Sequence, residues 1–155
     1  MTETVITPSD QKRKDNIPIH QGLFEFPLKA GQRPGLLANR CSQCGQSFFP
    51  RRMICPNCFE NSRMEQITLD TRGIVYAATV VHLDSPSGIK APYAYGYVEI
   101  PANNIRVFAL FTGDDPSSFN SGRLVELVLE PVRTDGRGQT IFGYKFKPLD
   151  NKDNP

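Results

Sequence analysis

Four cysteines, all that the chain has, lie in two Cys-x-x-Cys units, Cys41/Cys44 and Cys55/Cys58, separated by ten residues. A tetrahedral Zn²⁺ site needs four thiolates at about 2.3 Å from the metal, and a Cys-x-x-Cys turn delivers two of them from one short loop. An extended ten-residue spacer reaches about 33 Å, which leaves enough chain to fold back and bring the two turns together. The spacing therefore predicts a metal site closed by four thiolates.

Other interpretations of the four cysteines have less support from the sequence. Disulfides need an oxidising compartment, and the N-terminal residues contain no apolar segment that resembles a secretory signal. A redox-active Cys-x-x-Cys would explain one pair and leave the other without a role. Structural zinc is the main hypothesis because four protein ligands leave no open position for catalysis. Iron stays an alternative, since a four-thiolate shell accepts either metal.

The first cysteine unit is followed by Gly45, and the second contains Pro56. Glycine suits the left-handed backbone conformation that lets a turn wrap around a sulfur atom. Proline stiffens the turn in which it stands. We therefore expect a left-handed residue at position 45 and two tight turns around one metal ion.

Composition favours a soluble protein rich in strands and turns. The chain has 155 residues, of which 39% are apolar and 25 are Gly or Pro. No run approaches the ~20 apolar residues that a membrane helix needs. With no secretory signal and with cysteines of the thiol type, we expect a cytoplasmic protein.

The charge is unevenly distributed, although the net charge is only +2. Five arginines between residues 33 and 63 face a single acidic residue, Glu60, whereas residues 66–155 carry nine basic and ten acidic side chains. A local cationic patch attracts phosphate groups, but one this small does not by itself indicate nucleic acid.

The chain divides into five predicted segments. Residues 1–16 are polar and predicted to be a disordered tail, and residues 149–155 form a second tail. Residues 17–36 form an apolar docking arm, in which Pro18, Gly22 and Pro27 disfavour a helix. The arm packs either on its own domain or on a partner subunit. Residues 37–65 form the zinc ribbon, with a first strand at 35–40, and residues 66–148 form a barrel.

Five strand-like runs follow the ribbon. They are rich in β-branched and aromatic residues and are separated by turn signals, and they span 73–82, 92–100, 105–111, 123–131 and 140–147. Five short strands with no convincing helix predict a closed or nearly closed barrel, for which the OB-fold is the five-stranded solution. An SH3-like barrel is the alternative fold.

The sequence offers little for catalysis. His82 precedes Leu83 and Asp84, but a catalytic histidine needs a positioned partner, and a lone histidine at a strand end is more often structural. The glycines within 135–138 lie between two strands, so they indicate a hairpin turn and not a phosphate loop. We therefore assign no catalytic residue.

Single-stranded nucleic-acid binding is the alternative function. Tyr93, Tyr95 and Tyr97 alternate onto one face of a strand, and OB barrels use such aromatic faces to stack bases. Binding of a polyanion also needs several cationic contacts, which the slightly acidic barrel segment does not provide. Core or interface positions are the better interpretation of the tyrosines.

The order of these parts resembles a known family. The arm is followed by Cys-x-x-Cys-Gly, then by residues 49–51 (Phe-Pro-Arg) and 55–58 (Cys-Pro-x-Cys), and the barrel begins with residues 72–76 (Arg-Gly-Ile-Val-Tyr). This resembles the zinc-ribbon/OB-fold family of acyl-CoA-associated proteins, small subunits of thiolase-type complexes with a rubredoxin-like ribbon. The similarity covers roughly residues 17–148. Phe59 departs from the pattern, because a glycine is common at that position.

The resemblance implies a non-catalytic accessory subunit. In that family a large thiolase-like subunit carries the reactive residues, and the ribbon protein docks on it and helps to hold the nucleotide part of coenzyme A or acyl-CoA. Arg51 and Arg52 are the predicted phosphate contacts, because arginine forks match phosphate oxygens, and Lys90, in the long loop after the first barrel strand, is a third candidate. The alternative is that these cations are ordinary surface side chains.

Overall fold

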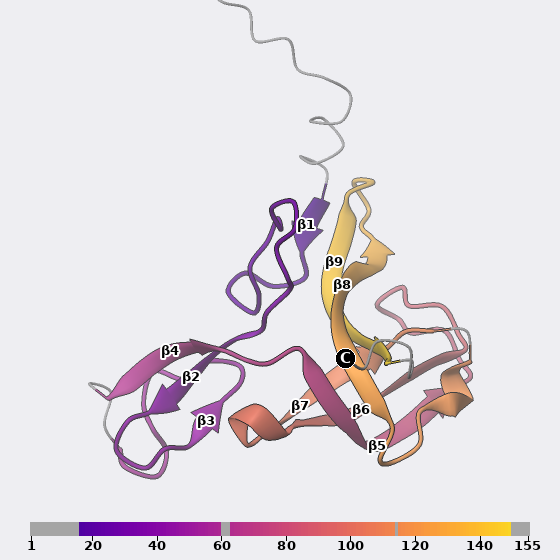
Figure 1. The fold of residues 1–155 in the computed structure, drawn as a ribbon. Helices are drawn as coiled ribbons and strands as arrows, with labels where there is room; N and C mark the ends of the chain where they lie inside the picture. The colour runs from indigo at the N-terminus through magenta and orange to yellow at the C-terminus, as the bar shows by residue number, and fades with distance from the viewer. Residues whose placement is uncertain (1–15, 60–62, 114, 150–155) are drawn as a thin grey trace, which may run out of the picture.

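The computed structural model describes residues 16–59, 63–113 and 115–149, and these residues form two lobes that are built almost entirely from strands (Figure 1). The smaller lobe holds β2 (Leu37–Cys41), β3 (Ser47–Phe48) and β4 (Met64–Thr68). The larger lobe holds β1 (Asn16–Pro18), β5 (Arg72–Val81), β6 (Tyr93–Ile100), β7 (Ile105–Phe111), β8 (Leu124–Thr134) and β9 (Thr140–Pro148). Short 3₁₀ helices η1 (Pro101–Asn103) and η2 (Pro116–Ser118) join barrel strands.

The ribbon lobe is a three-stranded antiparallel sheet in the order β3-β2-β4. Its central strand β2 begins two residues later than the predicted 35–40 and ends at Cys41, the first metal ligand. Strand β4 spans the predicted ribbon–barrel boundary near residue 66, in a segment that the sequence indicated only as a connector. Its pattern is weak because one edge strand of a small sheet buries few side chains.

The larger lobe is a closed barrel. Its strands follow the order β9-β7-β6-β5-β8, and β8 pairs with β9 to complete the circle. This confirms the predicted mostly-β fold with a five-stranded OB-type barrel after the ribbon, and the predicted strand ranges agree closely with the structure. The largest difference is in β8, which continues to Thr134 through an irregularity between Pro131 and Arg133. A bulge lets a strand continue past a proline that would otherwise interrupt its pairing.

Alternation on β6 separates the barrel interior from its outer face. Ala94 and Val98 are buried inside, while Tyr97 on the same strand is about half exposed outside. Gly96 also points inward, where an added Cβ would lie 2.0 Å from the carbonyl oxygen of Ala77 on β5, so only glycine fits this close approach. The tyrosines of β6 are therefore outside the barrel core.

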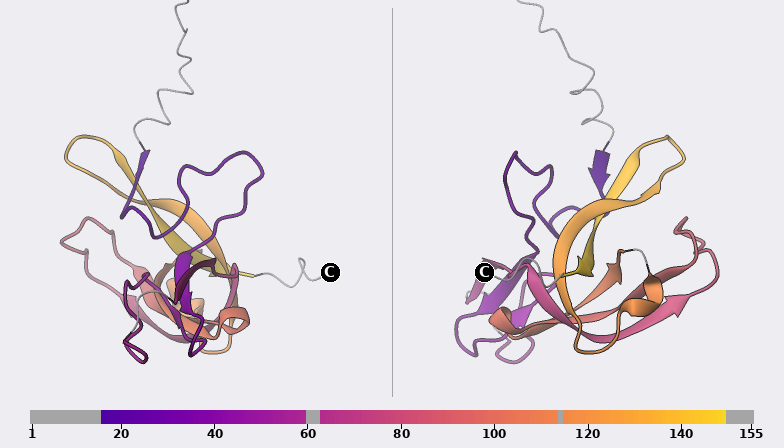
Figure 2. Two further views of the ribbon diagram at one scale, coloured as in Figure 1. Left: turned by 90° about the vertical axis from the view of Figure 1, so that its left-hand side faces the viewer. Right: turned by 45° about the vertical axis from the view of Figure 1, so that its right-hand side comes forward.

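The apolar arm packs on its own chain. Strand β1 pairs in parallel with β9, with Ile17 opposite Ile141, beside the β8–β9 hairpin that extends away from the barrel (Figure 2). Farther along, the amide of Leu37 donates to the carbonyl of Leu23, and Phe24 is buried in the main core. Residues 1–15, which include most of the predicted N-terminal tail, lie outside the described residues.

Tyr144 on β9 joins the three parts of the chain. Its ring makes edge contacts with Phe24 of the arm, at 6.3 Å between centroids, and with Phe49 of the ribbon, at 5.5 Å. Its hydroxyl donates a 2.9 Å hydrogen bond to the carbonyl oxygen of Phe108 on β7. Burial raises the pKa of Tyr144 to about 12, because the ionised phenolate loses hydration in this environment.

Within the described part of the chain, no helix is long and apolar enough to cross a membrane.

We predict that Tyr144→Phe lowers the free energy of unfolding by about 1 kcal/mol at pH 8, the typical net contribution of one hydrogen bond. The aromatic contacts of the ring remain in this variant. Tyr144 keeps its proton in the folded state up to a pKa of about 12, whereas the unfolded tyrosine ionises near 10. The wild-type advantage is therefore present below pH 10 and is lost as the pH rises from 10 toward 12.

Urea unfolding at several pH values measures this difference, with Tyr97→Phe on the outer face as the matched control. Equal stability of the Tyr144→Phe and wild-type proteins at pH 8 would contradict the prediction.

Candidate metal centre and ribbon surface

The four cysteine sulfurs converge on one point. The Sγ atoms of Cys41 and Cys58 are 4.0 Å apart, those of Cys44 and Cys55 are 3.6 Å apart, and all four lie within 4.8 Å of one another. A regular tetrahedron with metal–sulfur bonds of about 2.3 Å has sulfur–sulfur separations of about 3.8 Å. The four thiolates therefore fit a tetrahedral zinc ion, and no other such ligand group occurs among the residues that the structure describes.

The two cysteine turns have the same backbone geometry. The amide of Gly45 donates to the carbonyl of Cys41 at 2.8 Å, and the amide of Phe59 donates to the carbonyl of Cys55 at 2.7 Å. Both closing residues are left-handed, with φ of 74° at Gly45 and 56° at Phe59. The prediction for Gly45 is confirmed. Phe59 adopts the same conformation with a side chain present, which costs roughly 1–2 kcal/mol.

The sulfurs differ in their affinity for protons. Hydrogen bonds from the backbone, chiefly that of Cys44, lower the pKa of Cys41 to about 7. Desolvation raises the pKa of Cys58 to about 12. Four negative thiolates this close repel one another unless a cation lies between them, so metal binding must release protons, and metal affinity increases with pH.

The ribbon has little other internal stabilisation. Its buried apolar cluster consists of Cys41, Phe48 and Cys55, against which Cys58 and Met64 pack. Three of these five side chains are metal ligands. A core this small cannot offset the conformational entropy of the lobe, so the metal must supply much of the folding free energy.

Asn39, on the central strand β2, positions the segment that contains the predicted phosphate-binding arginines. Its buried side-chain amide donates to the carbonyl of Arg52 at 2.5 Å, and its amide oxygen accepts from the Arg52 backbone amide at 3.2 Å. This role of Asn39 was not predicted, and the one sign of it in the sequence is a polar residue that follows the apolar residues at the start of a strand.

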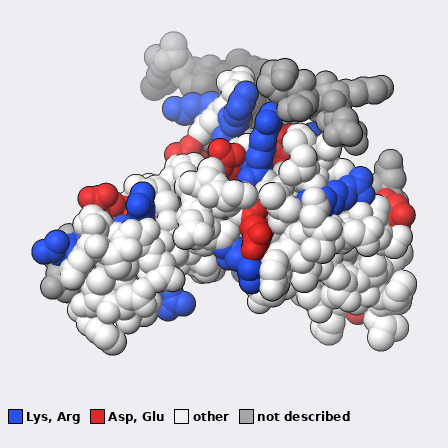
Figure 3. Space-filling view, turned by 60° about the horizontal axis from the view of Figure 1, so that its bottom comes forward, with Lys and Arg blue, Asp and Glu red and all other residues white. Residues whose placement is uncertain are grey.

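Arg51 and Arg52 are adjacent, and both are exposed. The guanidinium of Arg51 donates to the side chain of Gln66 on β4 at 2.6 Å, and that of Arg52 lies 5.9 Å from the ring centroid of Phe48. Figure 3 shows Lys and Arg side chains on several sides of the ribbon lobe, at the left of the view, with both acidic and uncharged surface between them. The lobe thus offers cationic groups that are held by partial contacts but remain open to a ligand.

Lys90 is not brought together with these arginines. It lies in the loop between β5 and β6, where its Nζ atom forms a 2.6 Å ion pair with Asp84. Asp84 also accepts from the backbone amide of Ala91 at 2.9 Å, and these contacts lower the pKa of its carboxyl, the bond from Lys90 most. The carboxylate that follows His82 in the sequence is therefore already used within its own loop.

The outer face of β5, β6 and β7 carries aromatic side chains, and its arginine is paired with a glutamate. Tyr97 and Phe108 are 48% and 47% exposed, with ring centroids 5.6 Å apart. The guanidinium of Arg106 lies 3.4 Å from the ring centroid of Tyr76 and forms a 2.6 Å ion pair with Glu99. This face offers surfaces for stacking, but its arginine is neutralised, so it lacks the charge pattern that a polyanion requires.

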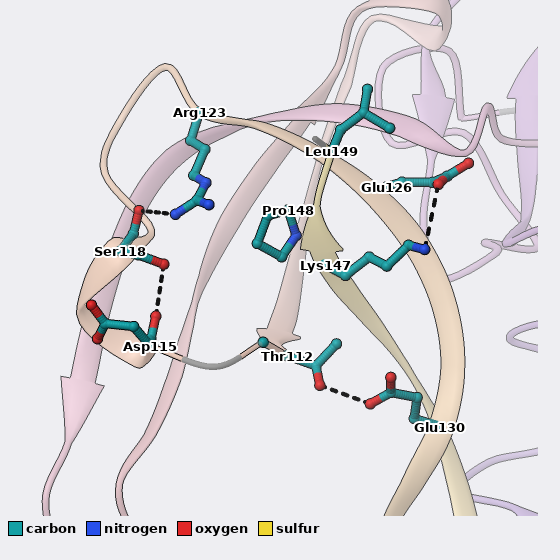
Figure 4. Close-up of a pocket in the computed structure, with 10 residues that line it drawn as sticks. Thr112, Asp115, Ser118, Arg123, Glu126, Glu130, Lys147, Pro148 and Leu149 are labelled. Atoms are coloured by element: carbon teal, nitrogen blue, oxygen red, sulfur yellow. Dashed lines mark hydrogen bonds and ion pairs between the residues drawn. The ribbon is translucent and has the colours of Figure 1, made fainter. Parts of the chain in front are cut away.

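A cavity of about 470 Å³ opens at the end of the barrel between η2, β8 and the end of β9 (Figure 4). Charged side chains that line the cavity form ion pairs or hydrogen bonds with other residues that line it. Lys147 lies 4.0 Å from Glu126, Arg123 donates to the carbonyl of Ser118 at 2.7 Å, and Thr112 donates to Glu130 at 2.8 Å. These contacts indicate a structural role, closing the barrel end.

We predict that Cys44→Ser releases the metal and unfolds the ribbon lobe, because three thiolates and one hydroxyl bind zinc much more weakly than four thiolates. Metal analysis after dialysis should fall from one equivalent toward zero. Amide exchange should increase in β2 to β4 and much less in β5 to β8. Ser42→Ala, in the same turn, is the control, and one retained equivalent of metal in Cys44→Ser would reject the four-ligand assignment.

Family models match most of the described chain. The rubredoxin-like zinc ribbon domain of ChsH2 matches residues 28–63, and the C-terminal OB-fold domain of ChsH2 matches residues 66–130. The ribbon match names the same kind of metal site that the four sulfurs form.

Two relatives match most or nearly all of the chain. The benzoylsuccinyl-CoA thiolase subunit BbsA of Thauera aromatica is 34% identical over 149 residues, which are 96% of this chain and 100% of that protein. A DUF35 domain-containing scaffold protein of Methanocaldococcus jannaschii is 35% identical over 122 residues, 77% of this chain and 86% of that protein.

Among solved structures, a chain of an Ltp2-ChsH2(DUF35) aldolase superposes with a TM-score of 0.59 at 24% identity, covering 74% of this chain and 84% of that chain. This likeness supports the arrangement of ribbon and barrel. The chain therefore belongs to the ChsH2 family, whose members join a rubredoxin-like zinc ribbon to a C-terminal OB-fold.

Proposed function

We propose that this protein is a non-catalytic, zinc-binding accessory subunit of a thiolase-type acyl-CoA enzyme. The observation that carries the proposal is the 34% identity, over the full length of the relative, to a protein described as a thiolase subunit. A second relative is described as a scaffold protein, which is a role of the same kind. The zinc has a structural role, because all four of its coordination positions are filled by protein.

The side chains available for chemistry support an accessory role. The four thiols are used as metal ligands, and Asp84 is bound to Lys90 and Ala91 and so is not free to orient His82. The charges of the barrel-end cavity are engaged with one another. Nucleophilic catalysis needs a nucleophile, a base and an orienting group within hydrogen-bond reach. In the described parts of the chain we find no such arrangement.

We further propose that the ribbon contacts the nucleotide part of coenzyme A through Arg51 and Arg52. These two guanidinium groups are exposed and adjacent, and Asn39 fixes the backbone between them and the metal site. Guanidinium forks bind phosphate oxygens in paired, charge-assisted hydrogen bonds. Lys90 lies in a different loop and is ion-paired, so it would contribute less to the same phosphate group.

The test of the accessory role is co-expression with the thiolase-type subunit encoded in the same genome. We expect the two chains to co-purify, and thiolase activity to require both. The isolated chain should show no thiolase activity. Full activity of the large subunit alone, unchanged on adding this chain, would reject the proposal.

The test of the phosphate contacts is the double variant Arg51→Gln/Arg52→Gln in the complex. Loss of charged hydrogen bonds worth about 1.5–3 kcal/mol should raise the Kd for coenzyme A by roughly ten- to a hundredfold. Calorimetric titration of the complex measures this, with the double variant Arg33→Gln/Arg137→Gln, at two exposed arginines, as the charge-matched control. An unchanged Kd in the double variant would assign the two arginines to the ordinary surface.

A further inference from the structure

The turn that closes the second half of the metal site carries large apolar side chains on its outside. Met53 and Phe59 are 87% and 81% exposed, and Ile54 is also exposed. The hydrogen bond between the Phe59 amide and the Cys55 carbonyl brings the ends of this turn together. Ile54 directly precedes the first residue of this turn and Phe59 is its last residue, so both are attached where the two ends of the turn meet. We call Met53, Ile54 and Phe59 the ribbon knob.

Phe59 has a left-handed backbone conformation, which is unfavourable for a residue with a large side chain. The equivalent residue of the first turn is Gly45, which adopts φ of 74° without steric cost, whereas Phe59 at φ of 56° brings its Cβ against the backbone. Closing the turn requires only the amide and the left-handed geometry, and glycine supplies both. A strained residue that persists with an exposed side chain points to a use for that side chain.

The knob is more exposed than the aromatic face of the barrel. On the barrel face, Tyr97 and Phe108 are only half exposed and pack on each other. Met53 and Phe59 are almost fully exposed on a lobe whose own core consists mainly of metal ligands. Exposed large apolar groups of this kind mark interaction sites, and a projecting aromatic side chain is the usual anchor of an interface.

The charges around the knob indicate its partner. Residues 40–60, from which the knob projects, contain three arginines, Arg40, Arg51 and Arg52, and one acidic residue, Glu60, so this segment is cationic on balance. A cationic rim around an apolar centre complements an apolar pocket with an acidic rim. The same rim disfavours a second copy of this knob, because it would bring like charges together.

We propose that the ribbon knob inserts into an apolar, acid-rimmed pocket of the catalytic subunit and that Phe59 is its anchor. This inference rests on the proposed function, since it identifies the surface through which the accessory role is performed. The left-handed strain at Phe59 is retained because the ring contributes more to the complex than it costs the free chain.

The test is Phe59→Gly, which removes the anchor and relieves the backbone at once. Binding is measured by calorimetry or surface plasmon resonance between the zinc-loaded chain and the thiolase-type subunit encoded in the same genome. We expect the Kd to rise at least tenfold, while the zinc content stays at one equivalent and the unfolding temperature stays equal or increases. Leu83→Gly, which removes a side chain that is 80% exposed in the loop after β5, is the matched control and should leave the Kd unchanged.

The outcomes separate the two proposals. Absence of binding by the wild-type chain would reject the accessory function and, with it, this partner. Binding by the wild type and equally tight binding by Phe59→Gly would reject the knob alone. Loss of self-association of the isolated chain in Phe59→Gly, seen by light scattering, would reassign the knob to a second copy. A Kd that does not rise with salt would reject the acidic rim.

Discussion

Convergence of four thiolates on one cation is the interaction on which the ribbon lobe depends. Three of the five side chains in its apolar cluster are metal ligands, so without the metal the lobe has almost no core. Its three strands are short, and β3 has only two residues. The charge of the ion is what permits four sulfurs to lie within 4.8 Å of one another. The turn that ends at Phe59 is thus held by that ion, and the segment with Arg51 and Arg52 is held by Gln66 and Asn39 as well.

A second constraint fixes the ribbon relative to the barrel. Phe49 follows the last ribbon strand before the metal turn, and its ring packs edge-on against Tyr144 of the barrel. Tyr144 also packs against Phe24 from the arm. The arm thus fills the junction between the lobes, which explains its apolar composition without requiring a partner to cover it.

The sequence was sufficient for features that depend on local spacing. Cysteine spacing located the metal ligands, and alternating apolar residues located the barrel strands to within a few residues. Features that depend on contacts between distant segments were missed. Asn39 holds Arg52 across 13 positions in the chain, and β1 pairs with a strand more than a hundred residues away. The ion pair between Lys90 and Asp84, which are six residues apart in a loop, was also not predicted.

Comparison of the two cysteine turns shows that the metal site requires a left-handed backbone at the closing residue but no side chain there. Both require a left-handed residue whose amide closes the turn, and Gly45 shows that no side chain is needed for this purpose. Phe59 meets the same backbone requirement at a conformational cost, and its ring lies in solvent. Burial cannot repay that cost within the isolated chain, because the ring buries little there. The closing hydrogen bond and the metal site hold the left-handed conformation whatever the side chain is, so we assign the benefit of the ring itself to the assembly proposed above.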